Sequence, residues 1–94
     1  MKGFIWDSGN ETKNWESHSV TKFECEEVFF NEPFVTKAPC EREERFILYG
    51  ETDKGRRLFL VYTVRDSKIR VISARDMSRK ERKRYEETVE NEKS

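Results

Sequence analysis

Three stretches rich in β-branched and aromatic residues, separated by short turns, constrain the fold of this chain more than any other feature. They cover residues 45–49, 57–65 and 69–75. Turn sequences at residues 53–55 and 66–68 separate them. Strands joined by such short turns pair with their sequence neighbours in antiparallel order. The pattern predicts an antiparallel meander, and the near-continuous apolar run at residues 58–64 predicts a central strand covered on both faces.

A capping box marks the start of a helix in the first third of the chain. The Thr21 hydroxyl is placed to accept a hydrogen bond from the first turn while the Glu24 carboxylate reaches back. Pro33 cannot continue a helix, so we expect this one to end near Asn31 or Glu32. Its apolar side is expected to comprise Phe23, Cys25, Val28, Phe29 and Phe30.

The remaining segments complete an α+β pattern. We expect short strands at residues 4–6 and 34–36, a surface helix near residues 11–17 anchored by Trp15, and a basic helix from the Ser78–Glu81 capping sequence to about residues 88–90. The predicted fold is a single α+β domain over residues 1–90. It has an antiparallel sheet of three to four strands, two N-terminal helices and a C-terminal helix, followed by a frayed tail at 91–94.

Charge is distributed unevenly along the chain although it sums to zero. Residues 1–51 carry six basic and eleven acidic residues, a net charge of −5, whereas residues 54–85 carry twelve basic and three acidic ones, a net charge of +9. A balanced total excludes binding of nucleic acid by bulk charge alone. The basic segment from Arg65 to Arg84 is different, because arginine forks match phosphate oxygens, so RNA phosphate is a natural ligand for it.

Several classes of protein are excluded by patterns that the sequence lacks. No apolar run approaches the roughly 20 residues of a membrane span, and the N-terminus has no secretory signal, so we expect a cytoplasmic protein. Cys25 and Cys40 have no CxxC partner and are expected to be free thiols. The sequence contains no metal-ligand spacing and no glycine-rich phosphate loop, so we expect neither a metal nor another cofactor.

Arginines of the third strand are candidates for phosphate binding. Simple alternation places Arg70 on the same strand face as Ile72 and Ala74, where an arginine without a function is unexpected. Arg75 ends the strand just before a helix, where strand ends and cap amides converge. The basic segment that contains them begins at Arg65. In the following helix, Arg79, Lys80 and Arg82 either bind RNA or form an ordinary solvated face.

Three further side chains have a chemical and a structural interpretation each. His18 can transfer protons near neutral pH, or it can cap a helix. Glu44, like its neighbour Glu43, can present a carboxylate to a substrate hydroxyl, or it can form a surface ion pair. Tyr85 can stack on a base or donate to a phosphate, or it can fill the core.

An ordered set of short motifs over residues 4 to about 87 resembles the BrnT family of bacterial type II toxins. The motifs are Trp6-Asp7, Lys13-Asn14, His18-x-Val20, residues 24–31, Glu44-Arg45-Phe46, Tyr62-Thr63-x-Arg65, residues 69–75 and Glu81-Arg82-x-x-Tyr85-Glu86. The Ile-Ser-Ala-Arg stretch at 72–75 with its basic helix is the most specific. Many relatives read Lys-His-Gly where this chain has Ser17-His18-Ser19, so the lysine and the glycine are replaced here.

The resemblance implies a RelE- and ParE-like fold and a small ribonuclease that arrests translation. It also implies a BrnA-type antitoxin partner, and operon DNA would be bound only through that antitoxin. Under this reading Arg65, Arg70 and Arg75 stabilise phosphate, His18 or Glu44 transfers protons, and Arg79, Lys80, Arg82 and Tyr85 hold RNA. The alternatives are a non-catalytic module that binds nucleic acid and an interaction domain whose basic face serves only the antitoxin.

Overall fold

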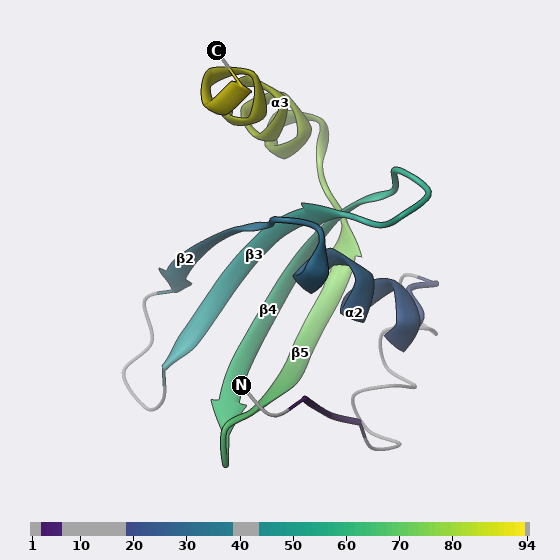
Figure 1. The fold of residues 1–94 in the computed structure, drawn as a ribbon, viewed down its shortest axis with the longest axis vertical. Coiled ribbons are helices and arrows are strands. Elements are labelled where there is room, and N and C mark those ends of the chain that lie inside the picture. Colours follow the sequence, from purple (N-terminus) through teal and green to yellow (C-terminus); the bar gives the residue numbers. More distant parts are fainter. Residues whose placement is uncertain (1–2, 7–18, 39–43, 94) are drawn as a thin grey trace.

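A five-stranded sheet with a helix across one face forms the centre of the protein (Figure 1). The computed structural model describes residues 3–6, 19–38 and 44–93. Within them the elements are β1 (Phe4–Ile5), α2 (Lys22–Phe30), β2 (Phe34–Ala38), β3 (Arg45–Glu51), β4 (Arg57–Arg65), β5 (Lys68–Asp76) and α3 (Arg79–Lys93). The predicted helix at 11–17 lies outside the described residues, as do His18 and Cys40.

The strand order is β1-β5-β4-β3-β2, so the predicted meander forms β3, β4 and β5. The predicted purely antiparallel sheet of three to four strands is wrong in one respect, because β1 adds a fifth strand that pairs with β5 in parallel, Phe4 opposite Ile69. The chain between these two paired strands contains α2 and the strands β2, β3 and β4, so it is long enough for a parallel pair. A strand of two residues, as β1 is, has no sequence pattern that predicts whether it pairs in parallel or antiparallel.

α2 covers one face of the sheet and starts where the capping box predicts. The Thr21 side chain accepts from the Glu24 amide at 3.1 Å, and the Glu24 carboxylate accepts from the Thr21 amide at 3.1 Å. The predicted five-residue apolar side is wrong, because Phe23 and Phe30 are 66% and 72% exposed. They lie seven residues apart, which places them on one side of the helix, away from the buried Cys25 and Val28.

Leucines and other apolar residues from three strands form the core beneath α2. In the middle of the sheet, Leu48, Leu60 and Ala74 lie side by side and are fully buried. Gly50 follows on β3, where an added Cβ would lie 3.2 Å from Pro33 Cβ and 3.3 Å from Val28 Cβ. The helix approaches the sheet this closely because position 50 has no side chain.

A β-bulge in β5 changes which residues share a face. Val61 pairs with Ser73 but Tyr62 pairs with Val71, so Ile72 is an extra residue on β5. The simple alternation predicted for this strand, with Arg70 and Ala74 on one face, is therefore wrong. Ala74 is buried under α2, whereas Arg70 lies opposite Thr63 on the other face.

The sheet face opposite α2, called the open face below, is only partly covered. β4 is the central strand, as predicted, and is fully buried at Leu58 and Leu60. On the open face Phe59 and Val61 are half-buried, so the predicted cover on both faces is only partial there. α3 lies beyond the end of the sheet where β5 finishes (Figure 1). It continues to Lys93, past the predicted end near residues 88–90, because its last residues include strong helix formers.

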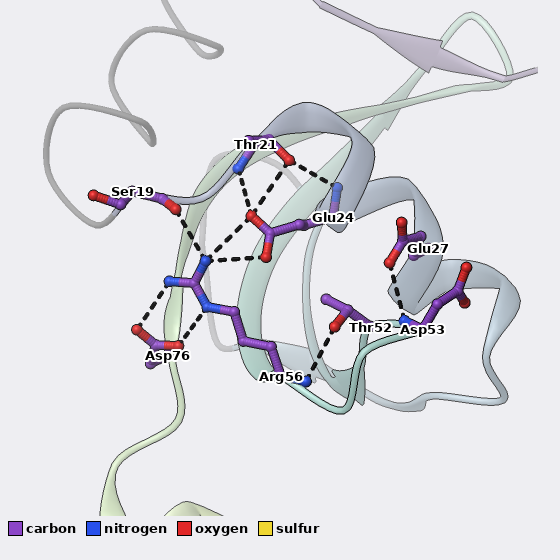
Figure 2. Close-up of polar contacts among 8 residues, drawn as sticks. All are labelled: Ser19, Thr21, Glu24, Glu27, Thr52, Asp53, Arg56 and Asp76. Carbon is purple, nitrogen blue, oxygen red and sulfur yellow. Dashed lines mark hydrogen bonds and ion pairs between the residues drawn. The ribbon is translucent and has the colours of Figure 1, made fainter.

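Arg56, in the connection between β3 and β4, joins three parts of the fold (Figure 2). Its guanidinium donates to both Glu24 oxygens at 3.0 and 3.1 Å, to both Asp76 oxygens at 2.7 and 3.0 Å, and to the Ser19 carbonyl at 2.9 Å. Its own amide donates to the Thr52 hydroxyl at 3.0 Å. The start of α2, the end of β5 and the β3–β4 connection therefore meet at one side chain.

The β3–β4 connection is also tied to α2 by neutral and charged groups. The Asp53 amide donates to the Glu27 carboxylate at 2.9 Å. At the end of the helix, the Asn31 amide group donates to the Glu51 carbonyl and to the Asp53 carboxylate, each at 2.9 Å. Polar contacts with the β3–β4 connection therefore fix α2 at both ends, and apolar contacts fix it to the sheet beneath.

We expect Arg56→Met to lower the free energy of unfolding by about 2 kcal/mol, because half-buried Glu24 loses its charged partner. Urea denaturation is the measurement. Arg56→Lys should recover only part of the loss, since an ammonium cannot replace the fork. Lys54→Met, at an exposed turn position, is the matched control. Equal stability of the Met and Lys variants would contradict the geometric role.

The contact between Arg56 and Glu24 also makes the stability of the protein depend on pH in the acid range. Burial opposes ionisation of Glu24, but hydrogen bonds from Thr21 and Arg56 hold its pKa below the ordinary value of 4.5. A lowered pKa in the folded state contributes stability above the unfolded pKa, and that contribution is lost as the pH falls through the folded one. The acid limb of the stability curve below about pH 4.5 should therefore be shallower in Arg56→Met than in the parent.

Cys25 of α2 is a free thiol that is fully buried between the helix and the sheet. Burial raises its pKa to about 12, and the charges of Glu24 and Glu26 act in the same direction. The thiolate, which is the reactive form, is therefore almost absent near neutral pH.

In a Cys40→Ser background, we expect Cys25 to resist a thiol reagent such as DTNB at pH 8 until urea unfolds the protein. Reaction of the folded protein at the rate of an unfolded peptide would contradict the burial. Because the folded pKa is raised, this group's contribution to stability is complete below the unfolded pKa, near 9, and declines as the pH rises from there toward about 12.

Candidate functional site

Four basic side chains lie on the open face at the end that carries the β4–β5 turn. They are Arg45, Arg65, Lys68 and Arg70. Arg65 pairs directly with Lys68 across the turn. Arg70 pairs with Thr63, which precedes Arg65 by two residues in β4. Arg65 and Lys68 are exposed, whereas Arg70 is half-buried. We call this set the basic end. A cluster of basic side chains attracts anionic ligands.

Arg75 lies on the same face at the opposite end of β5. Its guanidinium lies over the Phe59 ring, 4.0 Å from the centroid, and forms a fork with Glu81, at 2.8 Å to Oε1 and 3.1 Å to Oε2. The hydrogen bonds with Glu81 raise the pKa of Arg75, and those from Arg75 hold the pKa of Glu81 below its ordinary value. Arg75 is therefore oriented by an aromatic ring and a carboxylate.

The bulge brings Arg70 and Arg75 onto one face. Five residues separate them, and in a regular strand an odd spacing would place them on opposite faces. The extra residue in β5 restores the match, so both point away from α2. They remain about 15 Å apart at the usual rise of a strand. The structure thus brings Arg65 and Arg70 together but leaves Arg75 at the other end of the face.

Glu44 lies beside the basic end. Its carbonyl accepts a hydrogen bond from the Thr63 hydroxyl at 2.9 Å, and Thr63 in turn pairs with Arg70. The Glu44 carboxylate is exposed and forms an ion pair with Lys37 at 3.5 Å, so the alternative interpretation of this residue, a surface ion pair, is confirmed. His18, the other candidate for proton transfer, lies outside the described residues.

The predicted RNA-binding residues of α3 have different surroundings. Arg79, Lys80 and Arg82 are exposed. Arg82 lines a hollow of about 410 Å³ with Arg56 and Asp76. Tyr85 is only 7% exposed; its ring meets Phe34 edge-on at 5.5 Å, and burial raises its pKa. In this structure the Tyr85 ring fills space between helix and sheet, and a stacking role for it stays a prediction.

Part of the +9 segment serves the fold itself. Arg56 binds Glu24 and Asp76, and Arg57 forms ion pairs with Glu51 and Glu86. The acidic first half and the basic second half of the chain thus meet within one molecule. No local pattern distinguishes Arg56 from the other cations, because its partner Glu24 lies 32 residues away in the sequence. The charge imbalance between the two halves of the chain is the one sequence signal for such a contact.

A second cavity, of about 360 Å³, lies between α3 and the open face. The sheet contributes Phe34, Thr36 and Tyr49, and the helix contributes Glu81, Arg84, Tyr85 and Thr88. Among the residues that the structure describes, no group of three or more His, Cys, Asp or Glu side chains is arranged to hold a metal. Over the same part of the chain, no helix is long and apolar enough to cross a membrane.

Comparison with known proteins identifies the family. The family model for the BrnT ribonuclease toxin of type II toxin-antitoxin systems matches residues 6–81, most of the chain. The crystal structure of the Brucella abortus ribonuclease toxin BrnT superimposes with a TM-score of 0.63 at 21% sequence identity, covering 84% of this chain and 100% of that one. No curated protein matches the sequence. The α+β fold is thus shared with a solved BrnT structure, and the chain belongs to the BrnT family of ribonuclease toxins.

Proposed function

We propose that this chain is a metal-independent endoribonuclease that cleaves RNA on its open face, arrests translation and is neutralised by a BrnA-type antitoxin. One observation carries the proposal: in a chain of the ribonuclease toxin family, the bulge in β5 places Arg70 and Arg75 on the same face of the sheet. Bulges re-aim side chains and are frequent beside active sites.

Cleavage of RNA without a metal needs a base, an acid and a source of positive charge. The base removes the proton of the 2′-hydroxyl, whose oxygen then attacks the neighbouring phosphorus. The bond from phosphorus to the 5′-oxygen breaks, and the acid gives that oxygen a proton. Fixed cations stabilise the charge that builds up on the phosphate. The products are a 2′,3′-cyclic phosphate and a 5′-hydroxyl.

We assign these roles to basic side chains of the open face and of α3, to Glu44 beside the basic end, and to His18, which lies outside the described residues. Arg65, Arg70 and Arg75 stabilise phosphate charge, and His18 or Glu44 transfers protons. Because about 15 Å separates Arg70 from Arg75, we assign them to different phosphates of one strand. Arg79, Lys80 and Arg82 hold the RNA backbone as it leaves the sheet. An antitoxin with acidic groups would compete with RNA for the same cations.

Incubation of the purified protein with bulk cellular RNA, with and without EDTA, tests this function. We expect cleavage that survives EDTA and yields cyclic phosphate ends. Arg70→Ala and Arg75→Ala should each reduce the cleavage rate, by about 10²-fold for whichever arginine binds the scissile phosphate. Lys54→Ala, which removes one exposed cation from the β3–β4 turn, is the matched control.

Intact RNA at high protein concentration would contradict the catalytic proposal. Binding that falls steeply with salt but leaves the RNA uncut would favour a non-catalytic module that binds nucleic acid. If RNA is neither cut nor bound, the basic face serves a protein partner. Circular dichroism of each variant separates loss of function from loss of fold.

The pairing of Arg75 with Glu81 gives a second test. If Arg75 binds phosphate, the phosphate competes with the Glu81 carboxylate for the charge of its guanidinium. Glu81→Gln keeps the helix cap, because glutamine also suits the capping box, but removes the competing charge. We expect tighter binding of single-stranded RNA by fluorescence anisotropy, and a dependence on salt that is steeper by up to about 0.7 in log–log slope. Weaker binding would mean that Glu81 orients Arg75 instead.

A further inference from the structure

The side of α3 that faces the sheet is mostly polar. Glu81, Arg84, Tyr85 and Thr88 have the spacing of one helix face, and all four line the same cavity. A helix that packs on a sheet usually presents an apolar stripe there. Here Tyr85 is the one large ring on that face, and it packs against Phe34 at the cavity wall. The space beside it therefore stays open.

The cavity has the lining of a small-molecule site. Its volume of about 360 Å³ falls within the range of roughly 300–1,000 Å³ that is usual for such sites. Phe34 and Tyr49 are cross-strand neighbours and contribute half-buried aromatic rings from the sheet. Flat ligands such as nucleobases stack on rings of this kind.

The hydrogen-bonding groups around the cavity select the ligand. Both oxygens of Glu81 already accept bonds, from Arg75 and from the Ser78 amide, so this carboxylate is committed. The Thr88 hydroxyl donates to the Arg84 carbonyl at 2.8 Å. Arg84 is exposed and also lines the cavity, and its guanidinium is the strongest donor group among the lining side chains. A donor-rich site favours a base edge that only accepts, and guanine O6 and N7 form such an edge for an arginine fork.

We propose that this cavity binds one guanine base of the RNA, with its edge toward Arg84, and so selects where the strand is cut. The inference rests on the proposed function, because the cavity borders the Arg75–Glu81 pair and opens onto the same face. A base seated here would hold the strand across the open face. Arg84 then determines specificity and takes no part in the chemical step.

Titration with guanosine monophosphate, followed by ¹H–¹⁵N NMR, tests the site without any requirement for cleavage. We expect shifts in the amide signals of Phe34, Thr36 and Tyr49, and weaker binding of the adenosine, cytidine and uridine monophosphates. Arg84→Met keeps the apolar stem of the side chain and should weaken guanosine monophosphate binding by about tenfold. Lys83→Met removes the same charge one position away and should leave it unchanged.

Mapping of cleavage positions in bulk RNA is the second measurement. The parent protein and Lys83→Met should cut at a fixed position relative to guanine, whereas Arg84→Met should still cut RNA but lose that preference. Equal weakening by the two Met variants, or equal binding of all four nucleotides, would overturn the inference. If the parent cuts no RNA, the proposed function fails, and the nucleotide titration still decides whether the cavity binds guanine.

Discussion

The interaction of Arg56 with Glu24 and Asp76 determines how the two halves of this molecule fit together. Glu24 also closes the capping box that starts α2, so one carboxylate both begins the helix and fixes it to the sheet. Gly50 allows the helix to approach closely, because Val28 and Pro33 occupy the space that any side chain there would need. Polar contacts at the rim and close packing beneath α2 therefore depend on each other.

Much of this fold can be predicted from local sequence. The Thr21–Glu24 box and Pro33 bound α2 correctly because both act through neighbouring residues. The strands β3, β4 and β5 follow from their apolar runs and short turns. The direction of β1 could not be predicted from Phe4 and Ile5. Its parallel pairing with β5 depends on the path of the whole chain between the two strands. Partners such as Arg56 and Glu24 are likewise invisible to local patterns, since only the folded chain brings them together.

In the candidate site, too, local features can be predicted from the sequence and contacts between distant residues cannot. Sequence patterns mark Arg70 and Arg75 as candidates, but simple alternation predicts that Arg70 shares the face of Ala74, which is the wrong face. One inserted residue in β5 reverses that result, because it changes the parity of every position beyond it. Arg75 and Glu81 are only six residues apart in the sequence. The capping sequence already accounts for Glu81 through its hydrogen bond from the Ser78 amide, so nothing in the sequence predicts its second contact with Arg75.

The two faces of the sheet contribute unequally to the stability of the fold. Under α2, Leu48, Leu58 and Leu60 are fully buried, so most apolar area removed from water lies on that side. The open face keeps half-buried rings such as Phe59, with Arg75 stacked above it, and basic side chains at both ends. A face that contributes little to the core can carry cations that repel one another, because their cost is offset by the other side. That separation lets charged positions on the open face vary while the core beneath α2 holds the fold.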